Sequence, residues 1–359
     1  MLGIPSKLDS RPSHVFTGLL VFCLAAMVTI ENFDFIGAPA QERRERRQAE
    51  ILARQAYEPY QEDGYLIAEV CHELNHLTGL PLNAVFPVVF FVGYLFLFSA
   101  MWFWLAQLFA NPAATILGLV VVAVYAGFTL DASWDHPSDV FGAGFMAMSL
   151  AFMKKRNSTA ILVTSLAASF FWAKQMFVVP VLLLYLHFSA PKRWFGPLAL
   201  AAVVLLTGEA GQILYRLSFG PRPAAPAGLV TPAQLISQLP LAASRHFYFV
   251  APALLTLRLM YRRVDKAVLS AFIIYPCVVL AYVVKGFFVY EMRSFWVCVP
   301  ALCPLIAVWA DAAGMLDGTV RSSDGSADSR YPQSERTATD DDAKAAGAAG
   351  DNGVRAVDE

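Results

Sequence analysis

Two histidines and a glutamate have the spacing of a zinc-protease motif. His72, Glu73 and His76 form H-E-x-x-H within CHELNHLTGLP, residues 71–81. In a helix this spacing puts both histidines on one face, where they can bind zinc beside a glutamate acting as general base. The longer pattern H-E-x-x-H-x-x-G-x-x-H needs a third histidine where Leu82 stands. The motif is therefore open to two interpretations, a metal site or an amphipathic helix at a surface.

A second group of polar residues lies at one end of the long apolar segments. Charged groups in such places are costly and commonly functional, although single ones can simply reach the headgroup region. If these polar residues come together in the fold, they form a polar cavity in which cations hold a phosphate and carboxylates bind hydroxyls or accept a proton. The group comprises Glu31, Asp34, Asp131, Asp135, His136, Asp139, Lys174, Gln175, Glu209, Lys285, Glu291 and Arg293.

The short run His136-Pro137-Ser138-Asp139 has the composition of a helix start. Proline suits the first helical position, and an acidic residue suits the first turn. A helix N-terminus that faces a cavity is also favourable for an anion. The run therefore predicts a helix start, and an additional anion-binding role stays open.

The composition predicts a membrane protein around these residues. Of the 359 residues, 57% are hydrophobic and 15% are charged, whereas soluble domains carry about 25% charged residues. The mean hydropathy is +0.52. A net charge of −1 provides no basic excess for nucleic acid. The five cysteines contain no C-x-x-C pair, and we expect them to be small core residues rather than metal ligands or a disulfide framework.

Apolar runs bounded by charge or proline predict an all-α, polytopic membrane protein with about ten transmembrane helices. We expect a cytoplasmic N-terminus at 1–14, a transmembrane domain at 15–313 and a disordered cytoplasmic tail at 314–359. The count is good to about two helices, because several runs are shorter than the about 20 residues that span a bilayer. The expected spans are 15–30, 84–109, 114–130, 138–153, 158–173, 175–190, 195–215, 245–260, 267–289 and 294–312.

Basic residues set the orientation through the positive-inside rule. Lys154-Lys155-Arg156, Lys192-Arg193 and Arg262-Arg263 fall in loops expected inside, and both termini are then cytoplasmic. The long loop 31–83 is extracytoplasmic, and its helix-forming composition predicts helices lying on the outer membrane surface. Ala38-Pro39-Ala40 resembles a signal-peptide cleavage site, but two acidic residues precede it, and we expect an uncleaved first span.

Several of these stretches resemble the GT-C superfamily of integral-membrane glycosyltransferases, in particular the polyprenol-phosphate-mannose-dependent mannosyltransferases. In that family a His-Pro-acid motif opens a span, a basic inner loop follows, and a small-residue helix ends in Lys-Gln before a proline-containing span. The stretch YEMRSFWVCVPALCPL, residues 290–305, is similar to the glutamate-x-arginine start of a last core helix. The matching residues are His136-Pro137 with Asp139, Lys154 to Arg156, and Lys174-Gln175 with Pro180.

The resemblance implies transfer of a sugar from a polyprenyl-phosphate-linked donor to a glycan or glycolipid acceptor. The reaction would take place on the outer face of a bacterial plasma membrane, with an inverting or retaining outcome left open. Asp34 would be the general base, with Glu31 as the second choice. Some relatives use a divalent cation, so such a cofactor stays open. The donor phosphate would be held by Lys174, Gln175, Lys285 and Arg293, and the sugar or acceptor by Asp131, Asp135, His136, Asp139, Glu209 and Glu291.

Two other functions are compatible with parts of the sequence. A membrane-bound zinc metallopeptidase would use His72, Glu73 and His76, but it needs a third ligand that no recognisable pattern supplies. A lipid or solute carrier would need polar groups near the bilayer midplane and preferably an internal repeat. The polar residues gather at one side and no repeat is evident, which favours a one-sided enzyme.

Overall fold

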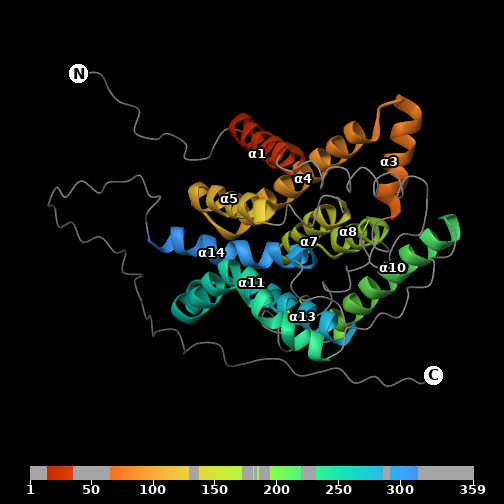
Figure 1. Ribbon diagram of the computed structural model, residues 1–359. Coiled ribbons are helices and arrows are strands. Elements are labelled where there is room, and N and C mark those ends of the chain that lie inside the picture. Colours follow the sequence, from red (N-terminus) through yellow and green to blue (C-terminus); the bar gives the residue numbers. More distant parts are fainter. Residues whose placement is uncertain are drawn as a thin grey trace, which may run out of the picture. The chain divides into compact units, whose positions relative to one another are not determined.

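The structure is a computed structural model that describes residues 14–34, 65–128, 137–171, 181, 184–185, 195–219, 232–285 and 292–313. Regular structure in these ranges is helical, without strands, which confirms the all-α prediction for this part of the chain (Figure 1). The helices are α1 (His14–Asp34), α3 (Tyr65–Thr78), α4 (Leu82–Leu108), α5 (Pro112–Phe128), α7 (Pro137–Lys154), α8 (Ser158–Phe171), α10 (Phe195–Phe219), α11 (Pro232–Met260), η3 (Tyr261–Arg263), α12 (Lys266–Ala271), α13 (Ile274–Lys285), η4 (Met292–Cys298) and α14 (Val299–Ala313).

The helices coincide with most of the apolar segments expected as spans. Two of them, over Val15–Phe33 in α1 and Ala84–Leu108 in α4, are long and apolar enough to cross a membrane by length and composition. Shorter apolar helices cover Pro112–Gly127, Ser158–Phe171, Lys266–Leu280 and Phe295–Trp309. The segment 175–190 lies outside the described residues except for positions 181 and 184–185, as does the tail 314–359. The number of spans stays a prediction.

Helix starts follow local sequence signals. Proline occupies the first position of α5 and of α7, where its missing N–H leaves no helical hydrogen bond unmade. The Asn111 side-chain oxygen accepts a hydrogen bond from the Ala113 amide at 2.9 Å and so caps α5. The helix start expected at Pro137 is confirmed, with Asp139 in the first turn of α7.

A tight turn joins α7 to α8. Arg156 adopts φ 55°, the left-handed conformation that usually favours glycine. The Asn157 amide donates to the Phe152 carbonyl at 3.0 Å, which closes the end of α7. The Asn157 side-chain oxygen then accepts from the Ala160 amide at 3.0 Å and begins α8. The two helices are therefore connected as a short helical hairpin.

One segment expected as a single span, 267–289, is broken in the structure. It forms α12 and α13, with a turn at 272–273 between them. Pro276 explains the break, because it cannot donate the helical hydrogen bond that the Phe272 carbonyl would accept. The segment 294–312 differs too, since it starts as the 3₁₀ helix η4 before α14. The segment 245–260 is the second half of the longer α11.

The core is built around α4. It packs against α1, α3, α5 and α7. The ring pairs Phe96–Phe145 and Phe103–Phe152 have centroids 4.9 and 5.7 Å apart. From the first pair to the second, the residue number rises from 96 to 103 in α4 and from 145 to 152 in α7, so the two helices run parallel. Parallel helices agree with the predicted orientation, in which both segments run from the outer to the inner face.

The last helix ties the end of the chain to this core. α14 packs against α5 and α11. The Trp104 indole in α4 donates a hydrogen bond to the Pro300 carbonyl at 2.9 Å, although the two residues are 196 positions apart. Trp104 is fully buried, so this hydrogen bond lies inside the protein.

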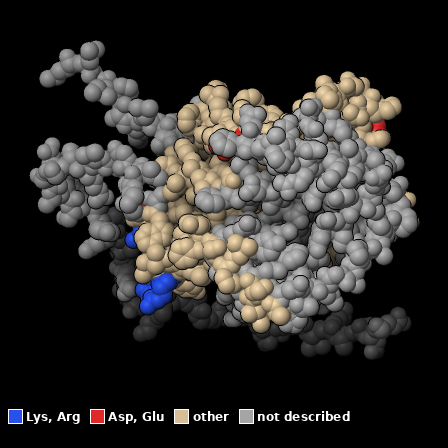
Figure 2. Space-filling view, viewed as in Figure 1, with Lys and Arg blue, Asp and Glu red and all other residues tan. Residues whose placement is uncertain are grey.

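Much of the described surface is apolar. Figure 2 shows few charged side chains on it, apart from a group of Lys and Arg at one side of the view. Exposed large apolar side chains occur on most of the helices and include Phe16, Leu19 and Ile30 on α1, Val88 and Val92 on α4, Val120 and Val124 on α5, Val163 and Leu166 on α8, Leu206, Ile213 and Leu217 on α10, and Ile236, Phe247, Leu254 and Leu259 on α11.

Candidate functional site

The structure describes only part of the predicted site. Glu31 and Asp139 have described side chains. Four more residues lie in described helices, but their side chains are outside the description: Asp34 ends α1, Glu209 lies in α10, Lys285 ends α13 and Arg293 lies in η4. The predicted residues Asp131, Asp135, His136, Lys174, Gln175 and Glu291 fall outside the described residues.

The end of α1 lies over the middle of α4. Phe22 packs edge-on against Phe91, and Phe33 packs against Phe90, with ring centroids 5.4 and 5.6 Å apart. The two α4 rings are sequence neighbours, whereas the two α1 rings are about three turns apart, so α1 crosses α4 at a wide angle. This crossing brings the polar end of α1 against the centre of the bundle rather than leaving it at the periphery.

The polar side chains of this end are Glu31 and Asn32. Asn32 is buried and donates from Nδ2 to the Tyr94 hydroxyl at 3.4 Å. Glu31 is half-buried, and its Oε2 is 4.0 Å from the position a Cβ on Gly127 would take. The Glu31 carboxylate therefore lies against the last turn of α5, just before the undescribed segment that contains Asp131.

The second carboxylate enters from α7. Asp139 is 6% exposed in the first turn of this helix, where an acidic group is favoured by the helix dipole. It lies within electrostatic range of the Tyr125 hydroxyl of α5. Tyr125 and Gly127 are two residues apart and so face nearly opposite sides of α5. Glu31 and Asp139 thus flank the same end of one helix from two sides.

Aromatic rings fill the space between these helices. Tyr94, Tyr125 and Trp296, called here the tyrosine–tryptophan cluster, come from α4, α5 and η4. Trp296 packs against Tyr94 and Tyr125 with ring centroids 6.3 and 5.2 Å apart. Phe249 of α11 closes the cluster at 4.7 Å from Tyr125. The Trp296 indole nitrogen is buried and has no hydrogen-bond partner among the described residues.

A buried histidine lies next to this cluster. His246, one turn before Phe249 in α11, is 6% exposed. Its ring packs edge-on against Phe295 at 4.2 Å and near Tyr275 at 5.9 Å. Because Phe295 precedes Trp296 in η4, this histidine belongs to the same region of the bundle as the two carboxylates. It is a titratable group that was not predicted from the sequence.

The H-E-x-x-H motif lies on α3, the helix predicted for the surface. His72 is partly exposed, and Glu73 and His76 are exposed. The Asn75 side-chain amide donates to the Leu80 carbonyl at 2.8 Å. Gly79 adopts φ 65°, and its amide donates to the Asn75 carbonyl at 2.9 Å. The glycine that extends the protease pattern therefore ends the helix as a left-handed cap.

The inner face of α3 is apolar. Ile67 and Cys71 are buried and Leu74 packs against the core, whereas Val70 and Leu77 remain exposed. Burial raises the pKa of the Cys71 thiol to about 12, so this thiol is neutral at physiological pH. No three His, Cys, Asp or Glu residues in the described part of the chain come close enough to hold a metal ion.

No family model matches the chain, and neither the curated proteins nor the solved structures include a match. The resemblance to GT-C glycosyltransferases stays a prediction from sequence motifs. The chemistry of the site is therefore argued from its own residues.

Sequence reasoning missed the uncharged and aromatic members of this region. Asn32 was visible between the two acids of ENFDF, but an amide carries no strong signal of function. Tyr94, Tyr125 and Trp296 lie inside apolar runs, where an aromatic residue usually means core packing. His246 lies in the apolar run RHFYFV, and a single histidine there equally suggests a core residue.

Proposed function

We propose that this protein is a membrane-embedded glycosyltransferase, which moves a sugar from a polyprenyl-phosphate-linked donor to a glycan or glycolipid acceptor on the extracytoplasmic side. The observation that carries this proposal is the placement of Glu31 and Asp139 at the same end of α5, on two sides of that helix. Two carboxylates from different helices at one end of an apolar bundle match the one-sided polar site that the sequence motifs predict.

The membrane setting is supported by the surface of the helices. α1 and α4 are long and apolar enough to span a bilayer. Exposed apolar side chains also occur on α5, α8, α10 and α11. Soluble monomers rarely expose contiguous apolar patches larger than about 300–600 Å², so lipid contact accounts for such a surface better than water. A bacterial plasma membrane with both termini in the cytoplasm is the proposed location.

General-base catalysis is the proposed role of the α1 end. Asp34 and Glu31 are three residues apart and lie on the same face of α1. One of these carboxylates accepts the proton of the acceptor hydroxyl. At the same time the hydroxyl oxygen forms a bond to the anomeric carbon of the donor sugar. The bond from that carbon to the phosphate oxygen breaks, and the electron pair leaves with the polyprenyl phosphate. Proton transfer to a positioned carboxylate contributes about 10²–10⁴-fold to rate.

Cations are proposed to stabilise the leaving phosphate. Lys174, Lys285 and Arg293 are the candidates, with Gln175 as a neutral donor. Charge stabilisation of this kind is strong where water is excluded. Asp139 accepts hydrogen bonds from sugar hydroxyls. The same role is proposed for Asp131, Asp135, His136, Glu209 and Glu291.

The test is transfer of a labelled sugar by the purified full chain in liposomes that contain a polyprenyl-phosphate-linked donor and a lipid-extract acceptor. Asp34→Asn, Glu31→Gln and Asp139→Asn are compared with Asp311→Asn, a control because Asp311 is exposed at the end of α14. We expect a loss of about 10²-fold or more in one of the two α1 variants. The control should keep wild-type activity.

Full transfer by the Glu31→Gln, Asp34→Asn double variant would exclude the α1 carboxylates as bases. A separate arm measures bound zinc and peptide cleavage in His72→Ala and His76→Ala. Zinc bound at one equivalent and lost in these variants, together with peptidase activity, would replace the transferase with a metallopeptidase. Movement of donor lipid across the liposome without any sugar transfer would instead identify a carrier.

A further inference from the structure

The positive charge of the described structure is concentrated in one place. Every Lys and Arg whose side chain is described lies at the end of α7, in the turn after it, or around the end of α11 and the start of α12. Figure 2 shows Lys and Arg side chains at one side of the view. We call them the basic surface; its members are Lys154, Lys155, Arg156, Arg258, Arg262, Arg263 and Lys266.

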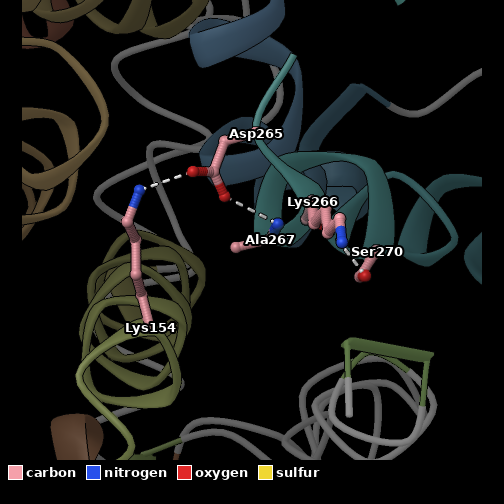
Figure 3. Close-up of polar contacts among 5 residues, drawn as sticks. All are labelled: Lys154, Asp265, Lys266, Ala267 and Ser270. Atoms are coloured by element: carbon pink, nitrogen blue, oxygen red, sulfur yellow. Dashed lines mark hydrogen bonds and ion pairs between the residues drawn. The ribbon is translucent and has the colours of Figure 1, made fainter. Parts of the chain in front are cut away.

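An ion pair holds the two halves of this surface together. Lys154 Nζ lies 2.6 Å from Asp265 Oδ2, although the residues are 111 positions apart. Asp265 Oδ1 accepts from the Ala267 amide at 2.8 Å and caps α12 (Figure 3). Both carboxylate oxygens are thus used within the fold. The α7–α8 turn and the α11–α12 turn therefore form one surface rather than two separate loops.

The surface carries a large excess of positive charge. Asp265 is the carboxylate that the structure pairs with one of its seven cations. Five of the cations are exposed in or next to the two turns, and Arg258 is exposed in the last turn of α11. Repulsion between so many like charges is unfavourable unless an anion lies over them. The charge therefore points to an anionic partner.

Two of the cations are held by local structure. Lys155 Nζ lies 4.3 Å from the centroid of the Phe103 ring, a cation–π contact that restrains it. Arg156 holds the left-handed position of the α7–α8 turn at φ 55°. Glycine is the least strained residue there because it has no Cβ, so the chain keeps a guanidinium at a position that sterically favours glycine. Both cations project from a fixed turn rather than a flexible tail.

The surroundings of the basic surface are apolar. Leu254, Leu255 and Leu259 on the last two turns of α11 are exposed by 50% or more, and Tyr261 at the start of the basic turn is 60% exposed. An aromatic side chain between exposed apolar residues and cations is typical of the boundary between acyl chains and headgroups. This border distinguishes a lipid headgroup from a soluble anion as the partner.

We propose that the basic surface binds the headgroup phosphate of an anionic phospholipid and that this lipid holds the α7–α8 and α11–α12 turns together on the cytoplasmic face. The inference rests on the membrane placement in the proposed function, but not on sugar transfer. Each surface cation contributes about 1 kcal/mol to attraction of anionic lipid, which corresponds to about fivefold in affinity.

The experiment measures lipid retained by the purified full chain in neutral detergent, titrated with phosphatidylglycerol or phosphatidylcholine and read by native mass spectrometry. The test variant is Lys155→Gln, Arg262→Gln, Arg263→Gln, and the matched control is Arg262→Lys, Arg263→Lys. Lys154 is retained in both, so the ion pair to Asp265 stays intact. The melting temperature in detergent without added lipid checks that both variants fold as the wild type does.

We expect the wild type and the lysine control to prefer phosphatidylglycerol, and the glutamine variant to lose up to about a hundredfold of that affinity. Equal retention of both lipids by the wild type would overturn the proposal. Displacement of phosphatidylglycerol by millimolar glycerol phosphate or inorganic phosphate would identify a soluble phosphate site instead. A glutamine variant that keeps the wild-type preference for phosphatidylglycerol, with sugar transfer intact, overturns only this inference, whereas a chain that stays monodisperse without detergent overturns the membrane placement itself.

Discussion

The close approach of α4 and α7 makes Gly144 a sensitive position. A Cβ built on Gly144 would lie 2.6 Å from Phe96 Cε1, and 3.4 Å from the Leu97 Cα. Carbon atoms do not approach to the first of these distances without a shift, so Gly144→Ala must move the Phe96 ring or separate the helices. That ring packs against Phe141 and Phe145 at 6.0 and 4.9 Å.

The expected loss of stability follows from these contacts. Overpacking of a well-packed core costs about 1–3 kcal/mol, and each displaced aromatic pair adds about 0.5–1.5 kcal/mol. Replacing a helical glycine with alanine returns about 1 kcal/mol through helix propensity. Taking the middle of each range, with one ring pair displaced, the net effect of Gly144→Ala is a destabilisation of about 2 kcal/mol. Because α7 carries Asp139, the same shift should lower sugar transfer.

Gly18 provides the matched control. It lies in α1, and a Cβ built there meets nothing within 4 Å, so Gly18→Ala gains the helix propensity without any clash. We expect the two alanine variants to differ by about 2–3 kcal/mol in unfolding by dodecyl sulfate in mixed micelles, followed by tryptophan fluorescence. If Gly144→Ala unfolds at the same dodecyl sulfate fraction as Gly18→Ala, the tight α4–α7 contact described above is wrong.

Three further predictions concern other positions. Asp265→Ala should lower the free energy of unfolding by about 1 kcal/mol more than Lys154→Ala, because it removes the α12 cap as well as the ion pair; similar losses in both variants would contradict the capping role. Arg156→Gly should raise the free energy of unfolding by about 1 kcal/mol through relief of the left-handed strain, and a lower melting temperature would argue against that strain. Burial raises the pKa of Cys71 from its ordinary value of 9.0 to about 12, so the stability contributed by the buried neutral thiol is present below pH about 9 and declines as pH rises towards 12. Alkylation of Cys71 in the folded chain should be much slower than in the unfolded chain at pH 9, and equal rates would show that the thiol is accessible.

Short-range features of the fold were predictable from the sequence. The helix start at Pro137 follows from a proline and an acid within four residues, and both act on the nearest backbone groups. The apolar helices likewise follow from uninterrupted apolar runs. The break before α13 was also encoded locally, by Pro276, but the apolar run on both sides of it hid the signal.

The H-E-x-x-H motif shows how local backbone contacts can explain a pattern that suggests chemistry. Asn75 and Gly79 both take part in ending α3, through a hydrogen bond to the Leu80 carbonyl and through a left-handed cap. A helix of this sequence needs such an ending whether or not metal binds. The structure therefore gives Asn75 and Gly79 a role in ending the helix, but it gives no such account of the spacing between His72 and His76.

Contacts between distant segments were beyond sequence reasoning. The hydrogen bond from Asn32 to Tyr94 depends on the angle at which α1 crosses α4. The packing of Tyr125 on Trp296 joins residues that periodicity assigns only to apolar faces. The cysteines were expected in the core, and this is confirmed for Cys71, Cys298 and Cys303, whereas Cys23 is exposed, contrary to expectation.

The hydrogen bond from Trp104 to Pro300 has a consequence for how the molecule assembles during synthesis. The indole of α4 and the buried face of α5 receive their final partner only when α14 has been made. If the helices enter a membrane, as the proposed function holds, the Trp104 indole nitrogen has no acceptor from α14 until that helix is made. A chain cut before Val299 would then leave this indole nitrogen without the Pro300 carbonyl, and we expect such a chain to be degraded faster than the full one.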